Sequence, residues 1–136
     1  MKLNTTTEYA LRILIYMAKK PDELFHTKEI SETLNISYKY MTKIITLLSN
    51  NQIISSKKGK YGGIILNKKI DDITVKEILT IMNDLDDDKC ILGLGLCSEK
   101  NKCSMHEVWM ESKNSIIHTF SQTTLESLAK NQGNLI

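Results

Sequence analysis

The sequence predicts a mostly α-helical protein with one small β-hairpin wing: a winged helix-turn-helix followed by a long C-terminal dimerisation helix. Two short helical patterns meet at a tight turn near Asn35, which is typical of a helix-turn-helix. A basic, glycine-containing segment at 57–63 lies between two isoleucine-rich runs, as in a hairpin. Residues 104–130 contain neither glycine nor proline, so a helix can continue through them.

The chain has 136 residues, which fits one domain or one domain with an extension. Its longest apolar run, around residues 13–18, is too short to cross a bilayer, and no signal-peptide pattern opens the chain. We therefore expect a cytoplasmic protein that binds no membrane. The expected parts are a winged helix-turn-helix DNA-binding domain at 1–82, a cysteine-bearing cluster loop at 83–103, and a dimerisation helix with its tail at 104–136.

The first helix is predicted to begin at a capping box, with Thr5 as N-cap and Glu8 at the third helical position. It is apolar on most sides as far as Lys19, so it should be buried. Thr27 should cap a second helix that ends at Leu34.

Ser37 should cap a third helix, which runs to about Ser49. Its apolar side chains recur at three- and four-residue steps and leave a polar, basic outer face. The wing follows as a strand at 53–56, a basic turn at 57–63 and a second strand at 64–66. Helix-turn-helix and wing together are a much stronger signal than either alone.

Two further capping boxes are expected, at Thr74–Glu77 and at Ser104–Glu107. The second should open a single helix to about Lys130, roughly 40 Å long at ~1.5 Å per residue. Such a helix would overhang a domain this small. Its apolar stripe therefore favours packing against a second copy of the chain, with folding back over its own winged helix as the alternative. The stripe contains Met105, Trp109, Ile116, Phe120 and Leu128, with Ile117 and Leu125 beside it.

Charge is divided unevenly between the two halves of the chain. Residues 1–70 carry 12 Lys/Arg and 5 Asp/Glu, whereas residues 71–136 carry 6 and 11. A basic first half indicates a polyanionic partner, here double-stranded DNA, although solvated surface charge alone would look the same. The residues expected to contact DNA lie at the start of the third helix and on the wing: Ser37, Tyr38, Lys39, Tyr40, Lys43, Lys57, Lys58 and Lys60.

Cys90, Cys97 and Cys103 lie within fourteen residues, and His106 follows. Cys103 precedes a predicted helix N-terminus, which favours a thiolate. Chance free thiols, a Cys₃His zinc site and an iron–sulfur cluster are all compatible with these residues. Zinc cysteines usually come in pairs two to four residues apart, and the gaps here are wider, so the spacing favours a cluster.

Several motifs, in this order, resemble the NsrR and IscR branches of the Rrf2 superfamily of winged-helix iron–sulfur repressors. They are Thr7–Arg12, Ile30–Glu32 with Ile36-Ser37, the wing around Lys58-Gly59 and Gly62-Gly63, Ile73–Ile78, and the three cysteines. The resemblance covers nearly the whole chain. It implies a homodimer crossed through the long C-terminal helix, a palindromic operator, and a [4Fe–4S] or [2Fe–2S] cluster held by the three cysteines.

The fourth cluster ligand separates the two branches. Glu8, supplied by the partner chain, matches the NsrR branch, and His106 matches the IscR branch. The first helix resembles NsrR more, which implies nitric oxide sensing, with redox or iron–sulfur status as the other signals. The first inter-cysteine gap is one residue longer than is usual in the family.

No nucleophile–base constellation or phosphate-cradling loop is visible, so we expect a regulator and not an enzyme. The alternative to a cluster-controlled repressor is a cluster-free or zinc-binding winged-helix regulator that responds to a partner protein or a small ligand.

Overall fold

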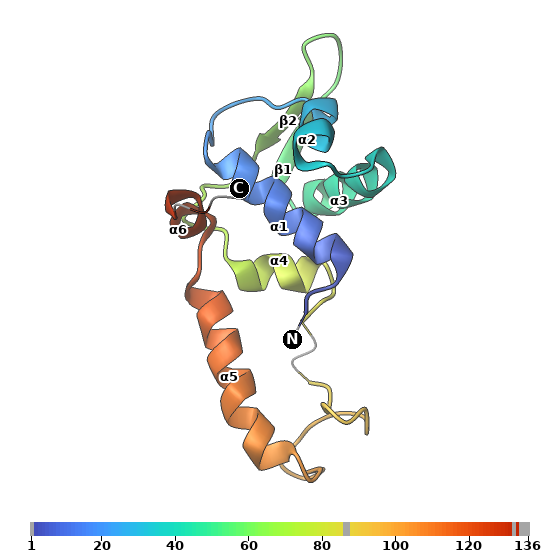
Figure 1. Cartoon of the computed structure of the whole chain (residues 1–136), viewed down its shortest axis with the longest axis vertical. Coiled ribbons are helices and arrows are strands. Elements are labelled where there is room, and N and C mark those ends of the chain that lie inside the picture. The colour runs from blue at the N-terminus through green and yellow to red at the C-terminus, as the bar shows by residue number, and fades with distance from the viewer. Residues whose placement is uncertain (1, 86–87, 132, 134–136) are drawn as a thin grey trace.

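The computed structural model describes residues 2–85, 88–131 and 133. Within them the chain is mostly helical, with one antiparallel two-stranded hairpin (Figure 1). This confirms the predicted fold class. The elements in chain order are α1 (Thr5–Ala18), α2 (Thr27–Leu34), α3 (Tyr38–Asn50), β1 (Ile54–Lys57), β2 (Gly63–Leu66), α4 (Val75–Ile81), α5 (His106–Gln122) and α6 (Leu125–Lys130).

The hydrophobic core lies where α1 crosses the helix-turn-helix and the base of the hairpin. As expected of a helix that is apolar on most sides, α1 buries several side chains completely and packs others partly against the core. The fully buried side chains of α1 and α3 that meet there are Ile13, Leu14, Met17, Met41, Ile44 and Leu48.

The hairpin β1–β2 has the predicted antiparallel pairing, with Ile54 opposite Leu66 and Lys57 opposite Gly63. A third segment joins its base, because Phe25 and Ile64 exchange backbone hydrogen bonds of 2.8 Å. The wing is thus anchored to the loop between α1 and α2, and its tip extends away from the body (Figure 1).

Three predicted helix starts need correction. Asn4, not Thr5, is the N-cap of α1, and its side chain accepts the N–H of Thr7 at 2.9 Å. His26 precedes α2 without a side-chain cap, so Thr27 is the first helical residue. Because α5 begins only at His106, Ser104 caps nothing.

Two other predicted N-caps, Thr74 and Ser37, are at the expected positions, but their side-chain contacts differ from the prediction. Thr74 accepts the N–H of Glu77, as predicted, but the Glu77 carboxylate pairs with Lys68 at 2.7 Å instead of returning to the cap. Ser37 does precede α3, although its side chain makes no capping hydrogen bond.

The prediction of a single C-terminal helix that reaches Lys130 is also wrong. Helix α5 ends at Gln122, and α6 restarts at Leu125 under a capping box in which Thr124 and Ser127 bond each other's backbone N–H. Between the helices, Thr123 accepts the N–H of Val75, and Leu125 donates to Ile73, both at 2.9 Å. Two β-branched threonines in succession are poor helix formers, and here the backbone pairs with residues 73–75 instead.

The C-terminal region folds back over its own winged helix in α6, whereas α5 extends away from it. Leu125 is fully buried in the core, and α6 packs on α1 of its own chain. Helix α5, about 25 Å long at ~1.5 Å per residue, packs on α4 and extends away from the winged helix (Figure 1). Within the described residues, no helix is long and apolar enough to cross a membrane.

Candidate functional site

The turn between α2 and α3 has the geometry that a helix-turn-helix requires. Asn35 adopts a left-handed conformation with φ of 51°, as the sequence predicted for this turn. Ser31 closes the turn from both sides, because its carbonyl accepts the N–H of Ile36 and its hydroxyl donates to the Ile36 carbonyl. Helix α3 is thereby set against α2 with its first turn facing solvent.

All five predicted DNA-contacting residues of α3 are exposed: Ser37, Tyr38, Lys39, Tyr40 and Lys43. Tyr38 is 67 % exposed and is the more exposed of the two tyrosines. Tyr40 is 43 % exposed and packs edge-on against Tyr9 of α1, with ring centroids 5.5 Å apart. Tyr40 therefore has a packing role as well as an exposed edge.

Arg12 fastens α1 to the same region. Its guanidinium donates to the Leu34 carbonyl at 2.8 Å and lies 5.6 Å from the centroid of the Tyr9 ring. Because Leu34 is the last residue of α2, this hydrogen bond satisfies a carbonyl left open at the helix C-terminus. The start of the recognition helix is thus held by α1 through two aromatic rings and one arginine.

The predicted wing lysines, Lys57, Lys58 and Lys60, are all exposed. Together with Lys39 and Lys43 they give the wing and the outer face of α3 a positive charge. Such charge suits the phosphate backbone of DNA, which carries most of the sequence-independent affinity.

The cysteine segment folds into a tight loop. Lys89 pairs with Leu96 in an antiparallel bridge, Cys90 donates its N–H to Gly95, and Cys97 donates to Asp88. Gly93 and Gly95 have φ of +71° and +93°, which glycine adopts without strain. This loop places Cys90 and Cys97 on the two facing strands at its base.

Cys90 and Cys103 form the first sulfur contact. Backbone N–H groups of Leu94 and Leu92 point at the Cys90 sulfur and lower its pKa, and the Cys103 thiol adds a further hydrogen bond. The same contact raises the pKa of Cys103, despite the nearby Met105 N–H. The helix N-terminus was expected to favour a thiolate at Cys103. In the structure the loop N–H groups favour it at Cys90.

Cys97 and His106 form the second contact. The Cys97 sulfur lies 3.2 Å from Nδ1 of His106, and this imidazole is only 4 % exposed. Its Nε2 lies 3.5 Å from the Glu99 carboxylate, which fixes the ring from the other side. Lys102 joins Glu99 and Glu107 at 2.7 Å each, so an exposed ion-pair network surrounds the start of α5.

All four sequence-predicted ligands of this chain's own loop are thus grouped as two pairs, Cys90 with Cys103 and Cys97 with His106. Among the described residues, no three Cys, His, Asp or Glu side chains are close enough together to hold a single metal ion. Three thiols, one of them surrounded by N–H donors, nevertheless match in chemistry the donors that iron–sulfur clusters use. Glu8 lies half-buried in the first turn of α1 and bonds none of these residues in the part of the chain that is described.

The chain is similar to known transcriptional regulators. The Rrf2 family model, described as an iron-dependent transcriptional regulator, matches residues 3–131. The chain belongs to the Rrf2 family of transcriptional regulators. It is 34 % identical over 131 residues to an HTH-type transcriptional regulator of Aquifex aeolicus, with 94 % of this chain and 91 % of that protein covered.

The chain is also similar to two regulators of Bacillus subtilis, NsrR and CymR. The HTH-type transcriptional regulator NsrR of Bacillus subtilis is 30 % identical, with 100 % of this chain and 95 % of that protein covered. The solved structure of CymR, the global cysteine regulator of B. subtilis, has a TM-score of 0.81 and 28 % identity, with 95 % of this chain and 96 % of that chain covered.

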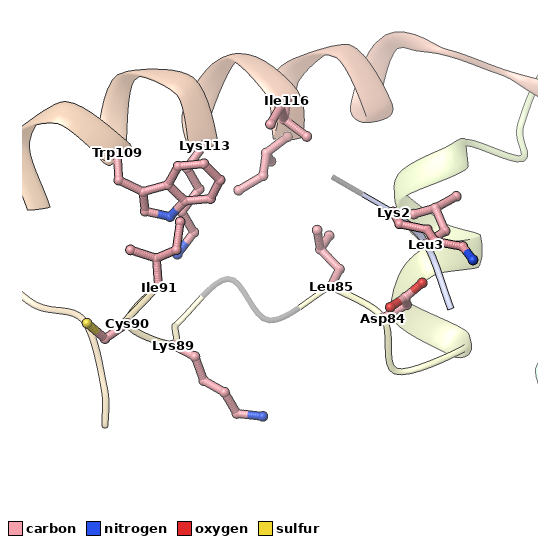
Figure 2. A pocket seen from close by; sticks show the side chains of 11 residues that line it. Lys2, Leu3, Asp84, Leu85, Lys89, Cys90, Ile91, Trp109, Lys113 and Ile116 are labelled. Atoms are coloured by element: carbon pink, nitrogen blue, oxygen red, sulfur yellow. The ribbon is translucent and has the colours of Figure 1, made fainter. Parts of the chain in front are cut away.

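A groove in this Rrf2 chain runs beside the cysteine loop. Its volume is about 660 Å³, and α5 forms one wall through Trp109 and Ile116 (Figure 2). The opposite wall comes from the N-terminal segment and from residues 84–85 and 89–91, Cys90 among them. The remaining lining residues are Lys2, Leu3, Asp84, Leu85, Lys89, Ile91, Lys113 and Ile117.

One hydrogen bond in this Rrf2 chain links the N-terminal segment to the cysteine segment, and the sequence did not predict it. The carboxylate of Asp84, at the start of the cysteine segment, accepts the N–H of Asn4 at 2.9 Å. Asn4 in turn caps α1, whose Tyr9 packs on Tyr40 of α3. A contact between positions 80 residues apart leaves no local pattern in the sequence, so only the tertiary structure reveals it.

Proposed function

We propose that the chain is a transcriptional repressor whose operator binding is controlled by an iron–sulfur cluster held by Cys90, Cys97 and Cys103. The observation that carries the proposal is the pairing of Cys90 with Cys103 and of Cys97 with the buried imidazole of His106, within one short segment that ends at the start of α5. When bound, such a cluster supplies iron that reacts with nitric oxide or oxidants, which fits sensing of nitric oxide, redox or iron–sulfur status.

The loop around Cys90 supports this assignment. Its glycine-dependent turns direct several backbone N–H groups at one sulfur, which stabilises the thiolate form that iron requires. Hydrogen bonds of this kind also tune the potential of a cluster that the sulfur holds. A loop that served only as a connection would have no need for donors aimed at a thiol.

The route from the cysteine segment to the DNA-contacting residues runs through α1. Asp84 holds Asn4, Asn4 caps α1, and α1 holds the start of α3 through Tyr9. A change in the Cys90–Cys103 loop that moves Asp84 would therefore disturb the helix that positions Tyr40. Such a signal can shift DNA binding only by the difference in stability between the two loop states.

We further propose that the protein acts as a homodimer on a palindromic operator. Among the helices and strands described, α5 packs mainly on α4, and the groove beside it has apolar walls formed by Trp109, Ile116 and Ile91. A second α5 related by a two-fold axis would cover such a surface. The symmetry of the dimer would then be matched by the symmetry of the two DNA half-sites.

The test compares wild type with a variant in which Cys90, Cys97 and Cys103 are all Ala. Both are purified without oxygen, and the DNA probe is a duplex selected by wild-type protein from a random-sequence library. We expect brown wild type that nitric oxide bleaches, and a colourless variant that binds the probe at least about tenfold more weakly. A Ser98→Ala/Ser104→Ala variant, altered on the same segment, should match wild type. Equal affinity of brown wild type and the triple variant would refute control by the cluster.

A second candidate is a cluster-free regulator of the same fold that responds to a partner protein or small ligand. The likeness to CymR, the global cysteine regulator of B. subtilis, favours it. Colourless wild type from anaerobic purification, without iron or with zinc in its place, would decide for this second candidate.

A further inference from the structure

Tyr61 lies in a hydrogen-bonded turn at the tip of the wing. The N–H of Gly62 donates to the Gly59 carbonyl at 3.0 Å, so residues 59–62 form a β-turn with Lys60 and Tyr61 at its two central positions. Gly59 has φ of +106°, and a Cβ at Gly62 would lie 2.1 Å from the Lys57 carbonyl oxygen. The turn is therefore closely packed on the end of β1, and Tyr61 projects from it.

Tyr61 is 81 % exposed, the highest value among the large hydrophobic residues in the part of the chain that is described. Its surroundings are basic, since the Lys60 ammonium lies 5.6 Å from the ring centroid and Lys57 and Lys58 precede the turn. A single exposed ring needs no explanation by itself. Here the exposed ring lies at the apex of a cationic hairpin, on the element that accompanies the helix-turn-helix. This surface suits a partner that is both anionic and partly apolar.

Building on the proposed function, we infer that Tyr61 enters the DNA minor groove beside each half-site and selects A·T over G·C base pairs there. The minor groove is about 6 Å wide and is lined by deoxyribose, which offers an apolar surface to a flat ring. At its floor, A·T pairs present only acceptors, which the Tyr61 hydroxyl can meet as a donor. The exocyclic amino group of guanine adds a donor and bulk at the same place. Lys57, Lys58 and Lys60 would lie along the flanking phosphates.

The experiment uses the full-length protein, purified without oxygen, and a duplex selected from a random-sequence library, with the wing-facing base pairs located by footprinting. Those pairs are made A·T, G·C or inosine·C. Inosine·C lacks the guanine amino group and so resembles A·T in the minor groove, while its major groove resembles that of G·C. Wild type should bind the A·T and inosine·C probes alike and the G·C probe roughly tenfold more weakly.

Tyr61→Ala should lose this discrimination and keep the salt dependence of binding, because no charge is removed. Tyr61→Phe should keep most of the affinity for the A·T probe and lose part of the discrimination, since only the hydroxyl is removed. Lys60→Ala is the matched control on the same turn. It should lower the slope of log affinity against log salt by about one and keep the discrimination.

The inference fails if Tyr61→Ala discriminates as wild type does, or if inosine·C behaves like G·C in wild type. Because Tyr61 is exposed, each variant should unfold at the wild-type temperature, which thermal unfolding checks. If wild type selects no duplex from the library, the proposed function fails. If wild type selects one and Tyr61→Ala binds and discriminates equally, only the inference about Tyr61 fails.

Discussion

At the scale of single residues, His106 and Glu8 differ in how far their surroundings prepare them to act as ligands. His106 is buried, its Nδ1 lies 3.2 Å from the Cys97 sulfur, and the Glu99 carboxylate faces its other nitrogen. A carboxylate that orients an imidazole is the usual support of a ligating histidine. Glu8 lies half-buried in the first turn of α1, where an acidic side chain also stabilises the helix dipole.

We therefore expect His106 to be the fourth ligand. His106→Ala should shift the visible absorbance of the anaerobically purified protein and speed the loss of colour in air, because the cluster would lose one of its four attachments. Glu8→Ala should leave both unchanged. The reverse pattern would assign the ligand to Glu8 of a second copy. The conservative variant Glu8→Gln is a control for changes in helix stability.

At the scale of elements, the wing and the C-terminal helices show opposite relations between local pattern and structure. The wing follows its sequence: isoleucines lie in both strands, and Gly59 and Gly62 are the first and last residues of the turn between them. The C-terminal region does not, because Thr123 and Leu125 gain backbone hydrogen-bond partners at Val75 and Ile73 that a continuous helix would exclude. The capping box that restarts α6 has Ser127 at its third position, so the usual Ser/Thr-x-x-Glu/Gln template overlooks it.

The tight packing of Gly62 gives a test at this scale. In Gly62→Ala, the new Cβ would lie 2.1 Å from a carbonyl oxygen of β1, so the wing turn must open. We expect affinity for the selected duplex to fall roughly tenfold, measured by fluorescence anisotropy. The midpoint of thermal unfolding should change little, because the wing tip lies outside the core. Ser56→Ala, on the same hairpin, should bind as wild type does, and normal binding by Gly62→Ala would show that the turn shape is unimportant.

At the scale of the whole molecule, the exposed basic wing and the cysteine segment are far apart. The hairpin tip and the cysteine segment lie at opposite ends of the long axis, and α1, α4 and α5 lie between them (Figure 1). The winged helix and α6 share one core, whereas α5 extends from it with an apolar face along the groove. A second copy of the chain would complete that face.

The groove gives a test of dimerisation. Ile116→Glu puts a charge on its apolar wall and should convert a dimer into a folded monomer, measured by sedimentation equilibrium with circular dichroism as the check on folding. Ser115→Glu changes the neighbouring, exposed position and should stay dimeric. Wild-type protein that sediments as a monomer, or Ile116→Glu that remains dimeric, would contradict the proposed interface.

Local chemistry in the sequence was sufficient to predict the fold class, the wing and the exposed basic residues of α3. These depend on periodicity, turn residues and charge, which operate over a few positions. The cysteines and His106 also lie within one short segment of the sequence.

Only the tertiary structure decided how these four residues are paired, which cysteine has the lowered pKa, where the C-terminal helix ends and how Asp84 reaches Asn4. Each of these depends on contacts between distant parts of the chain or on the direction of individual N–H groups. Because such contacts compete with local preferences by only a few kcal/mol, local pattern alone does not show which arrangement prevails.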